Sequence, residues 1–516
     1  MKKTTRLAFL GAWIAGTAIA AGTVQPALAA PGTGDAAPRA CSLSQQQTPV
    51  ADADAIFVSP DGDDAATGTK DAPFRTFMRA QEAAQPGDTV YIRGGVYNEF
   101  TISQTDNPHE NVYHFVNDIY KSGITYAAYP GDERPLFDFS SVPTDQRVAA
   151  FYIGEEITDV TFAGFDVTGV KVGAQKQSEV FRIGGGANFE NMAAYDNEGP
   201  GFYYTAQGTG YVINSDSYNN VGPTNTSAGN GDGFGAHGNN VWFIGNRAWA
   251  NSDDGYDNIS STGRVAYINS WSFDHHGNAD GVGDKNGFKV GGYAYRVEGL
   301  PDPLPLHLVV NDLAVDNGAN NFYANHQPGQ SAYWLGNTAD KPGYGSNFNM
   351  LERVSPTSPD NIPGYREVLH GNIAYTGVAT SENAVPAEQQ ANNSWTLGIT
   401  PAADDFVSTD QSQLTAPRDA AGRLPEVDYL RPVAGGELEG LGYLANNDAC
   451  GTLSQVVDAL TQSGDISSQG VSRALQAKLD AGSLDAFVAH VADQRGDHIS
   501  DYAADTLSIV AYALSI

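Results

Sequence analysis

The sequence predicts an all-β chain wound as a right-handed parallel β-helix and followed by a small α-helical domain. A degenerate phrase recurs along the centre of the 516 residues, in which a β-rich run leads to an aromatic or apolar residue and then to Asn or Asp and Gly. Equivalent positions are 23, 31, 24 and 42 residues apart, and they are Tyr195, Tyr218, Trp249, Phe273 and Val315. The shorter steps fit coils stacked about 4.8 Å apart, and the longer steps fit coils with inserted loops.

Two other repeat folds share some of these features. A leucine-rich repeat has a similar period but needs a leucine pattern that this sequence lacks. A β-propeller needs about forty residues in each regular blade, which the steps of 23 and 24 residues contradict. The parallel β-helix is therefore the prediction for residues 54–445.

Two short segments precede that domain. Residues 1–29 combine early basic residues, an apolar run over 7–21 and the small-residue sequence ALA at 27–29, which is the pattern of a secretory signal peptide. The apolar run is shorter than the roughly 18 to 20 residues that span a bilayer. Residues 30–53 are rich in Ala, Gly, Pro, Ser and Gln and indicate a linker. We therefore expect a soluble protein that is secreted from the cell.

Helices are expected at both ends of the β-helix. Residues 73–97 predict an amphipathic helix followed by the first strand, and such a helix would cap the strand edges at the open end of the stack. After Cys450, apolar residues recur three and four positions apart, with breaks at Gly464 and Gly482. Residues 450–516 are therefore predicted to form a small helical domain.

The chain is strongly acidic. With 60 acidic and 28 basic residues, its formal charge is −32. This charge argues against a nucleic-acid or anionic-membrane partner, because both need basic surfaces. An acidic polymer is repelled as well, unless a cation bridges it to the protein.

Only two cysteines occur, Cys41 and Cys450, which excludes a disulfide scaffold and a multi-cysteine metal site. An oxidising exterior favours pairing. The sequence leaves open both one long-range bridge and two separate thiols.

Four aspartates stand in two short motifs, NGDGF with Asp232 and NSDDGYD with Asp253, Asp254 and Asp257. Asp232 precedes Asp253 by 21 residues, about one coil, so stacking brings the four side chains to one face. Their carboxylates would repel one another, and Ca²⁺, which takes about 6 to 8 oxygen ligands, would relieve the repulsion. A single Asp-Gly pair is usually a solvated turn, but the recurrence favours a metal site. The ligand ladder of an EF-hand is missing.

Lys289 follows in NGFKVGG, 32 residues after Asp257, which is one coil plus an insertion. Its neighbours are apolar or small. A desolvated lysine beside a divalent cation favours the neutral amine, which is the form that a general base requires. The alternative is an ion pair with one of the many acids, and the position of Lys289 favours the base.

Three histidines, His237, His275 and His276, indicate turn or groove-lining positions rather than a zinc site, because adjacent residues on a strand face opposite ways. The region lacks Gly-x-Ser-x-Gly, which leaves little support for a serine hydrolase. A glycoside hydrolase stays open, because paired acids can act as acid and base.

The motifs resemble those of the pectate lyases of polysaccharide lyase family 9. The resemblance covers about Ile56 to Tyr375, with the opening FVSPDGDDAATGTK, the ordered set DGF, NSDDGYD and NGFKVGG, and NGANNFYANH at 317–326. It implies a Ca²⁺ site on the four aspartates, a Brønsted base at Lys289 and β-elimination on a polygalacturonate-type chain. Members of this family also act on rhamnogalacturonan, so the uronate polymer stays open.

Three residues depart from the usual pattern of that family. Tyr256 stands in place of Trp, Asn258 in place of an apolar residue, and His237 in place of a frequent lysine. These departures bear on subsite chemistry more than on the metal or the base. Residues 450–516 resemble FIMAH, a helical module of secreted actinobacterial enzymes. The role of this module stays open: it could bind polysaccharide or the cell wall, or be an appendage without a binding function.

We therefore expect a secreted, monomeric, Ca²⁺-dependent pectate lyase that acts on an acidic polysaccharide. Two alternatives of other classes stay open, a glycoside hydrolase on the same fold and a non-catalytic polysaccharide-binding protein.

Overall fold

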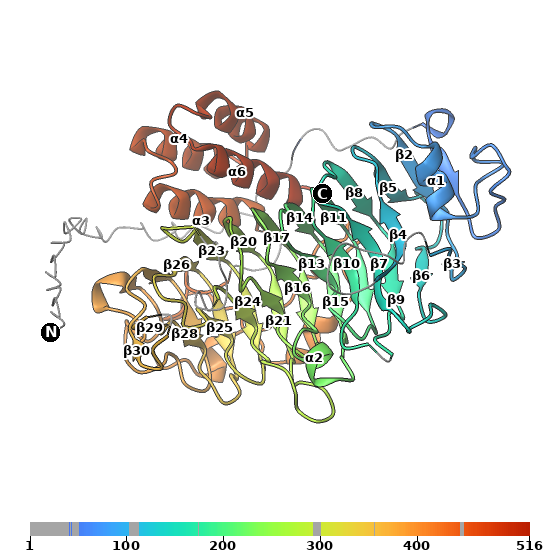
Figure 1. Ribbon diagram of the computed structural model, residues 1–516. Helices are drawn as coiled ribbons and strands as arrows, with labels where there is room; N and C mark the ends of the chain where they lie inside the picture. Colours follow the sequence, from blue (N-terminus) through green and yellow to red (C-terminus); the bar gives the residue numbers. More distant parts are fainter. Residues whose placement is uncertain are drawn as a thin grey trace, which may run out of the picture. The chain divides into compact units, whose positions relative to one another are not determined.

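The structure of the protein, a computed structural model, describes residues 41, 43, 51–102, 113–173, 175–292, 301–355, 357–443 and 448–516 (Figure 1). The predicted signal peptide and most of the predicted linker lie outside the described residues. Within the described ranges, no helix has both the length and the apolar character that crossing a membrane requires.

Three parallel sheets form the body of the protein. Sheet 1 has 12 strands in the order β1 (Ile56–Val58), β2 (Thr89–Ile92), β5 (Thr125–Ala128), β8 (Val160–Ala163), β11 (Ala187–Glu190), β14 (Gly210–Ile213), β17 (Val241–Ile244), β20 (Val265–Ile268), β23 (Leu306–Val310), β26 (Ser331–Leu335), β31 (Glu367–His370) and β33 (Gln390–Ala391). Sheet 2 has nine, in the order β4 (Tyr113–Ile119), β7 (Arg147–Ile153), β10 (Glu179–Ile183), β13 (Phe202–Tyr204), β16 (Phe234–Ala236), β19 (Tyr256–Asp257), β22 (Phe288–Lys289), β25 (Phe322–Tyr323) and β28 (Phe348–Asn349).

Sheet 3 has ten strands, in the order β3 (Val96–Tyr97), β6 (Leu136–Asp138), β9 (Asp166–Thr168), β12 (Ala193–Tyr195), β15 (Asp216–Tyr218), β18 (Arg247–Trp249), β21 (Trp271–Phe273), β24 (Leu313–Val315), β27 (Thr338–Asp340) and β32 (Ile373–Ala374). An antiparallel pair, β29 (Glu352–Arg353) and β30 (Asn361–Ile362), lies outside these sheets. Successive turns of the chain supply successive strands, which confirms the predicted parallel β-helix.

The register confirms the repeat found in the sequence. Tyr195 pairs with Tyr218, Tyr218 with Trp249, Trp249 with Phe273, and Phe273 with Val315, all in sheet 3. Each step of 23 to 42 residues is therefore one coil, and the extra residues of the longer steps lie in loops.

A column of aromatic rings fills the inner face of sheet 2. Neighbouring ring centroids are 4.5 to 5.2 Å apart, and the column consists of Phe151, Phe181, Phe202, Phe234, Tyr256, Phe288, Phe322 and Phe348. These centroid distances match the spacing of about 4.8 Å between hydrogen-bonded strands, so one ring per coil sets a rigid wall behind the outer face. Tyr256 is fully buried in this column. The expectation that its departure from the family pattern affects sugar subsites is therefore wrong.

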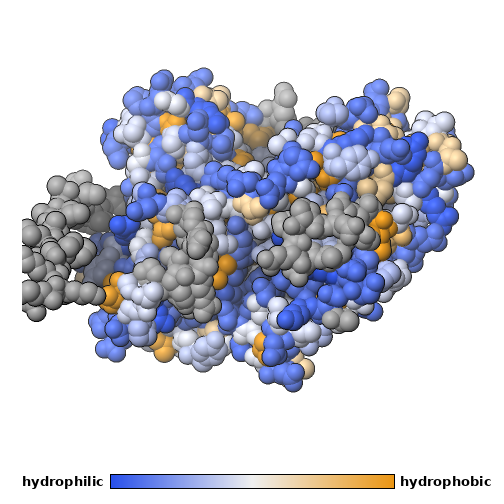
Figure 2. Space-filling model, in the orientation of Figure 1, coloured by the Kyte–Doolittle hydropathy of each residue, from blue (hydrophilic) through white to orange (hydrophobic). Residues whose placement is uncertain are grey.

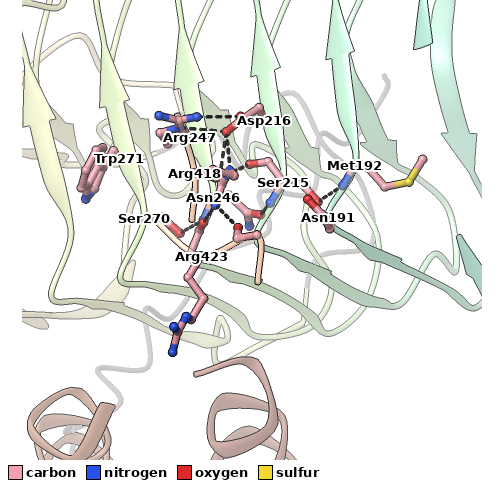
Figure 3. A network of polar contacts seen from close by, with 12 residues as sticks. Asn191, Met192, Ser215, Asp216, Asn246, Arg247, Ser270, Trp271, Arg418 and Arg423 are labelled. Atoms are coloured by element: carbon pink, nitrogen blue, oxygen red, sulfur yellow. Dashed lines mark hydrogen bonds and ion pairs between the residues drawn. The ribbon is translucent and has the colours of Figure 1, made fainter. Parts of the chain in front are cut away.

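A polar ladder runs through the turns between sheets 1 and 3. Its members accept a hydrogen bond from the backbone N–H of the preceding coil, and they are Ser215, Asn246, Ser270, Asp312, Asn337, Asn372 and Asn393. Figure 3 shows the part of the ladder from Ser215 to Ser270. Buried backbone donors in the turns thus find partners at every coil.

The outer face of sheet 3 is covered by residues 399–443, which include two short 3₁₀ helices, Ala403–Asp405 and Gln411–Thr415. Apolar side chains of sheet 3, such as Trp271 and Leu313, pack in one buried cluster with Leu414 and Tyr429. A buried ion network fixes the same segment, because Asp216 binds Arg247 at 2.8 Å and Arg418 at 2.7 Å (Figure 3).

The outer face of sheet 1 is covered by the C-terminal helices, namely α3 (Ala449–Gln462), α4 (Gln469–Asp480), α5 (Leu484–Gln494) and α6 (Asp501–Ala513) (Figure 1). These helices confirm the predicted helical domain. One buried apolar cluster spans both parts, with Ile244 and Leu308 from sheet 1 and Leu453 and Leu507 from the helices among its members.

Polar contacts support that interface. Trp242 Nε1 donates to Thr506 Oγ1 at 2.9 Å, and Asn311 Nδ2 donates to Thr452 Oγ1 at 3.0 Å. The guanidinium of Arg264 forms an ion pair with Asp465 at 2.7 Å. The helical domain is therefore packed onto the β-helix as part of its structure.

The N-terminal end of the stack is capped by α1 (Phe77–Ala83), as predicted. The buried side chain of Gln81 donates to Asp118 O at 2.8 Å and accepts from Tyr120 N at 3.1 Å, so it satisfies the open edge of β4. The first strand differs from the prediction: β1 precedes the helix and pairs with β2, because Ile56–Val58 supplies a short apolar strand that the sequence pattern did not single out. A further one-turn helix, α2 (Asn225–Ala228), lies between β15 and β16.

Cys41 and Cys450 form a disulfide, with Cα atoms 5.6 Å apart. This decides between the two alternatives that the sequence left open. The bridge joins a residue of the N-terminal segment to the second residue of α3.

Removal of residues 444–516 should destabilise the β-helix. Loss of the helices exposes the apolar outer face of sheet 1, and such a patch promotes aggregation. We expect a lower melting temperature and strong binding of a hydrophobic dye, measured by calorimetry and fluorescence against the full chain. An unchanged melting temperature would show that the helical domain is an independent appendage.

Asp312→Asn should raise stability. Asp312 Oδ1 accepts from Ser270 N at 2.7 Å, but Oδ2 is buried without a hydrogen-bond partner among the described residues, and burial raises the pKa of Asp312 well above its usual value. The asparagines of the ladder use the corresponding amide as a donor, as Asn337 Nδ2 does to Val309 O at 3.0 Å. An amide at 312 should therefore add about 1 to 3 kcal/mol to the free energy of unfolding at pH 7.

The gain from Asp312→Asn should shrink toward pH 4. A carboxyl whose pKa is raised in the folded state lowers the free energy of unfolding as pH rises above its unfolded pKa. This effect is absent at a pH at which the group is protonated in both states. Asp159→Asn, at an exposed turn position, is the matched control and should change little. Equal melting temperatures for Asp312→Asn and the parent at pH 7 would contradict this account.

Candidate active site

The outer face of sheet 2 carries a row of residues in register, one from each strand. Along this row Arg182 pairs with Tyr203, Tyr203 with Gly235, Gly235 with Asp257, and Asp257 with Lys289. Neighbours in the row are about 4.8 Å apart because they lie on adjacent strands. The insertion between Asp257 and Lys289 leaves the stack, so the two side chains meet although they are 32 residues apart.

The other three predicted ligands stand in turns that lead into sheet 2. Asp232 lies two residues before β16, and Asp253 and Asp254 lie just before β19. The backbone N–H of Asp254 donates to Asp232 Oδ1 at 3.2 Å. A Cβ on Gly233 would lie 2.7 Å from Gly255 O, so glycine permits the two turns to stack this closely.

The structure brings all five predicted residues together in one buried site. Their exposed fractions are 3% for Asp232, 2% for Asp253, 0% for Asp254, 5% for Asp257 and 4% for Lys289. Asp232, Asp253 and Asp254 offer carboxylate oxygens that lie within 4.8 Å of one another. Burial, together with repulsion from neighbouring carboxylates, raises the pKa of Asp232 and of Asp253 well above the usual value.

Lys289 is ion-paired with three aspartates. Its Nζ lies 2.9 Å from Asp254 Oδ2, 3.3 Å from Asp257 Oδ2 and 2.9 Å from Asp284 Oδ2. Burial alone would lower the pKa of the amine, but the attraction of these carboxylates, Asp254 first, outweighs it and raises the pKa well above its usual value. The ion-paired alternative thus describes the contacts of the amine, and its neutral form beside a bound cation stays a prediction.

Two residues of the site were missed from the sequence. Asp284 contacts Lys289, and its backbone N–H also donates to Asp253 Oδ1. Asn286 binds Asp254 Oδ1 twice, through its backbone N–H at 2.7 Å and its Nδ2 at 2.9 Å. Both residues belong to the Gly- and Asp-rich insertion before β22, whose GDKN sequence repeats the acid-before-strand pattern of the other turns.

The three histidines occupy different positions in the structure. His237 lies beside Asp232 and Asp257, and its Nε2 is buried without a hydrogen-bond partner among the described residues. His275 is fully buried and accepts from Asn251 N at 3.1 Å, so it holds a turn. His276 is exposed.

The donor set fits a hard divalent cation. Four buried carboxylates face one lysine, and burial of like charges at this density is unfavourable without further positive charge. Carboxylate and backbone oxygens are the ligands that Ca²⁺ prefers. Asp232, Asp253, Asp254 and Asp257 are therefore the residues that would hold such an ion.

Comparison with known proteins agrees with these features. The family model described as the Pel9A-like, right-handed β-helix region matches residues 56–372. The chain belongs to this family of polysaccharide lyases. The match confirms the predicted handedness of the coil and the resemblance to family 9.

Curated relatives of this chain include several pectate lyases. Pectate lyase L of Dickeya dadantii is 30% identical over 409 residues, which cover 76% of this chain and 86% of the relative. Pectate lyase PEL9 of Emericella nidulans is 26% identical over 426 residues, which cover 74% and 93%.

Two solved structures resemble the Pel9A-like chain in fold and sequence. A rhamnogalacturonan lyase is 33% identical with a TM-score of 0.68, and the match covers 76% of this chain and all of that one. Pectate lyase Pel9A is 27% identical with a TM-score of 0.58, and the match covers 78% and 94%.

Asp253→Asn should stabilise the chelated protein and remove its response to Ca²⁺. Because the pKa of Asp253 is raised in the folded state, the native carboxyl lowers stability as pH rises above about 4, its unfolded pKa. In chelator, calorimetry should show a higher melting temperature for the variant at pH 7 and a smaller difference at pH 4. With Ca²⁺ at 100 times its Kd, the parent should gain about 2.7 kcal/mol and the variant much less.

Asp280→Asn is the matched control, since Asp280 is exposed on the same insertion that carries Asp284. It should leave both the chelated stability and the Ca²⁺ response unchanged. A less stable Asp253→Asn variant with a full Ca²⁺ response would contradict the assignment of Asp253 as a ligand.

Proposed function

We propose that the protein is a secreted, Ca²⁺-dependent pectate lyase that cleaves a polygalacturonate-type chain by β-elimination, with Lys289 as the base. One observation carries this proposal: the amine of Lys289 lies within 3.3 Å of two of the four clustered aspartates on the outer face of sheet 2. The pectate lyase relatives support the substrate class.

Bound Ca²⁺ would withdraw charge from the uronate carboxylate and so acidify the proton at C5. Lys289 takes that proton, a double bond forms between C4 and C5, and the bond from C4 to the glycosidic oxygen breaks. The leaving oxygen takes a proton from water, and the product is an unsaturated uronate. The amine can act as a base only when its carboxylate partners are engaged elsewhere, because Asp254 and Asp257 otherwise keep it protonated. Asp254 and Asp257 would therefore serve two roles, as ligands and as the switch on the basicity of Lys289, whereas Asp232 and Asp253 would serve as ligands.

Fixed neighbours orient these groups. Asn286 holds one oxygen of Asp254 through two hydrogen bonds, and Ile259 N donates to Asp257 Oδ1 at 2.9 Å. The other oxygen of each carboxylate faces Lys289. The strand register thus positions the base to within one strand spacing of its partners.

The wider organisation belongs to the same proposal. Residues 1–29 would direct export, and residues 30–53 would link this leader to the lyase domain at 54–445. The helical domain at 450–516 would complete the chain, which would act as a monomer. The acidic surface is compatible with a polyanionic substrate because the cation lies between them.

A second candidate is a rhamnogalacturonan lyase, which is favoured by the solved structure of that name at 33% identity and a TM-score of 0.68. The elimination chemistry and the residues would be the same. Assays on polygalacturonate and on rhamnogalacturonan distinguish the two.

Lys289→Ala should abolish formation of the unsaturated product. Without the amine the proposed base is missing, and we expect a loss of at least about 100-fold, the typical contribution of a general base. The measurement is the ultraviolet absorbance of the product on polygalacturonate, with Ca²⁺ and with excess chelator. The parent should lose activity in chelator, and its rate should rise into alkaline pH as the amine loses its proton.

Lys171→Ala, at an exposed position, is the control and should keep full activity. Saturated products, or activity that persists in chelator, would favour a glycoside hydrolase. A parent protein that binds the polymer without cleaving it, and a Lys289→Ala variant that binds equally well, would favour a non-catalytic binder.

A further inference from the structure

Beyond the aspartate cluster, the outer face of sheet 2 holds a second group of buried charges. Glu179 is fully buried on β10, and Arg147 on β7 binds it through Nε at 3.2 Å and also through Nη2. Arg182, also on β10, donates from Nη1 to Glu179 Oε1 at 3.3 Å. Two arginines thus share one carboxylate.

Arg182 carries the surplus positive charge of this group. Glu179 already accepts two hydrogen bonds from Arg147 and one from the Tyr113 hydroxyl, and it is the only hydrogen-bond acceptor of the Arg182 guanidinium among the described residues. The guanidinium lies 5.5 Å from the ring centroid of Tyr113 and 5.8 Å from that of Tyr203. Such rings hold an arginine in place by cation–π attraction while its remaining donors stay available. In a chain of charge −32, a positive group held in place on one face is unusual and therefore calls for an explanation.

The register places Arg182 on the same row as the site. Arg182, Tyr203, Gly235, Asp257 and Lys289 occupy successive strands. Four strand spacings separate Arg182 from Lys289, or roughly 19 Å along the β-helix axis.

Tyr203, Gly235 and Asp257 occupy the row between these ends. Gly235 contributes no side chain, and a Cβ there would lie 2.9 Å from the Tyr203 ring. The outer faces of sheets 1 and 3 are covered by apolar packing, whereas this face is lined by charged and aromatic side chains. In Figure 2, the coloured surface between the helical domain and α2 is mostly hydrophilic or neutral.

We propose that Arg182 binds the carboxylate of a distal uronate when a chain lies along this row with its scissile bond at Lys289. The planar guanidinium matches a carboxylate through paired hydrogen bonds, and Tyr203 offers a ring to the sugar between. This assignment rests on the proposed function, because it takes a uronate chain as the ligand. It makes the enzyme specific for chains long enough, and acidic enough, to reach Arg182.

The test compares chain lengths. Arg182→Gln should raise KM roughly 10- to 100-fold for long galacturonate oligomers, the range for loss of one charge-assisted hydrogen bond, and should leave kcat nearly unchanged. For a trisaccharide, which cannot span the row, both constants should match the parent. Arg182→Lys, which keeps the charge but loses the fork, should recover part of the affinity for long oligomers. Arg75→Gln, at an exposed residue on the N-terminal cap, is the matched control and should resemble the parent throughout.

A second measurement separates this proposal from the proposed function. Calorimetric binding of a long galacturonate oligomer to Lys289→Ala should weaken by the same factor when Arg182→Gln is added, and binding of a neutral, fully methyl-esterified oligomer should not change. Absence of lyase activity in the parent, with weakened oligomer binding in Arg182→Gln, would overturn the proposed reaction and keep the subsite. Full lyase activity with an equal effect of Arg182→Gln on all chain lengths, or with no effect, would overturn the subsite and keep the reaction. Unfolding curves that match the parent establish that each variant is folded.

Discussion

In-register stacking of parallel coils is the constraint on which the rest of the structure depends. Each strand position repeats at about 4.8 Å, so any residue type that suits one coil can form a column through its neighbours. Inside sheet 2 this produces a column of aromatic rings, and on the outside it produces the row that contains Asp257 and Lys289. A shift of one residue would exchange these two faces. The packing of the core and the geometry of the site are therefore fixed by the same register.

The sequence predicted this architecture because the backbone of each coil favours particular residue types at its strands and turns, and these types recur along the chain. Tyr195, Tyr218 and Trp249 fall on one column, as their spacing indicated. The aspartates were predictable for the same reason, since two acid-rich turns one coil apart must meet. The first strand was missed because Ile56–Val58 is too short to show a pattern.

Other features could not be predicted, because they depend on which side chains face each other. The ion pairs of Lys289 require knowledge that Asp284 returns to the site from an insertion of unknown path. Tyr256 was linked to subsite chemistry because it departs from the family pattern, yet strand alternation points it into the core. The packing of the helical domain on sheet 1 could not be predicted either. The outward residues of β17, β20 and β23 are apolar, but a sheet buried by any other segment would show the same pattern.

The three outer faces of the β-helix connect the fold to the chemistry. Two of them are apolar and are covered, one by residues 399–443 and the other by the helices, so they contribute burial and stability. The third holds buried charges that are unfavourable on their own: burial raises the pKa of Asp232 and Asp253, and Lys289 cannot neutralise four carboxylates. A rigid aromatic column behind this face and the two covered faces beside it stabilise an arrangement that the site alone would not maintain. In the proposed reaction, buried acids that cannot relax apart would favour a cation between them, and the same cation would free Lys289 from its partners. The unfavourable electrostatics of the site would then be what makes the proposed base available.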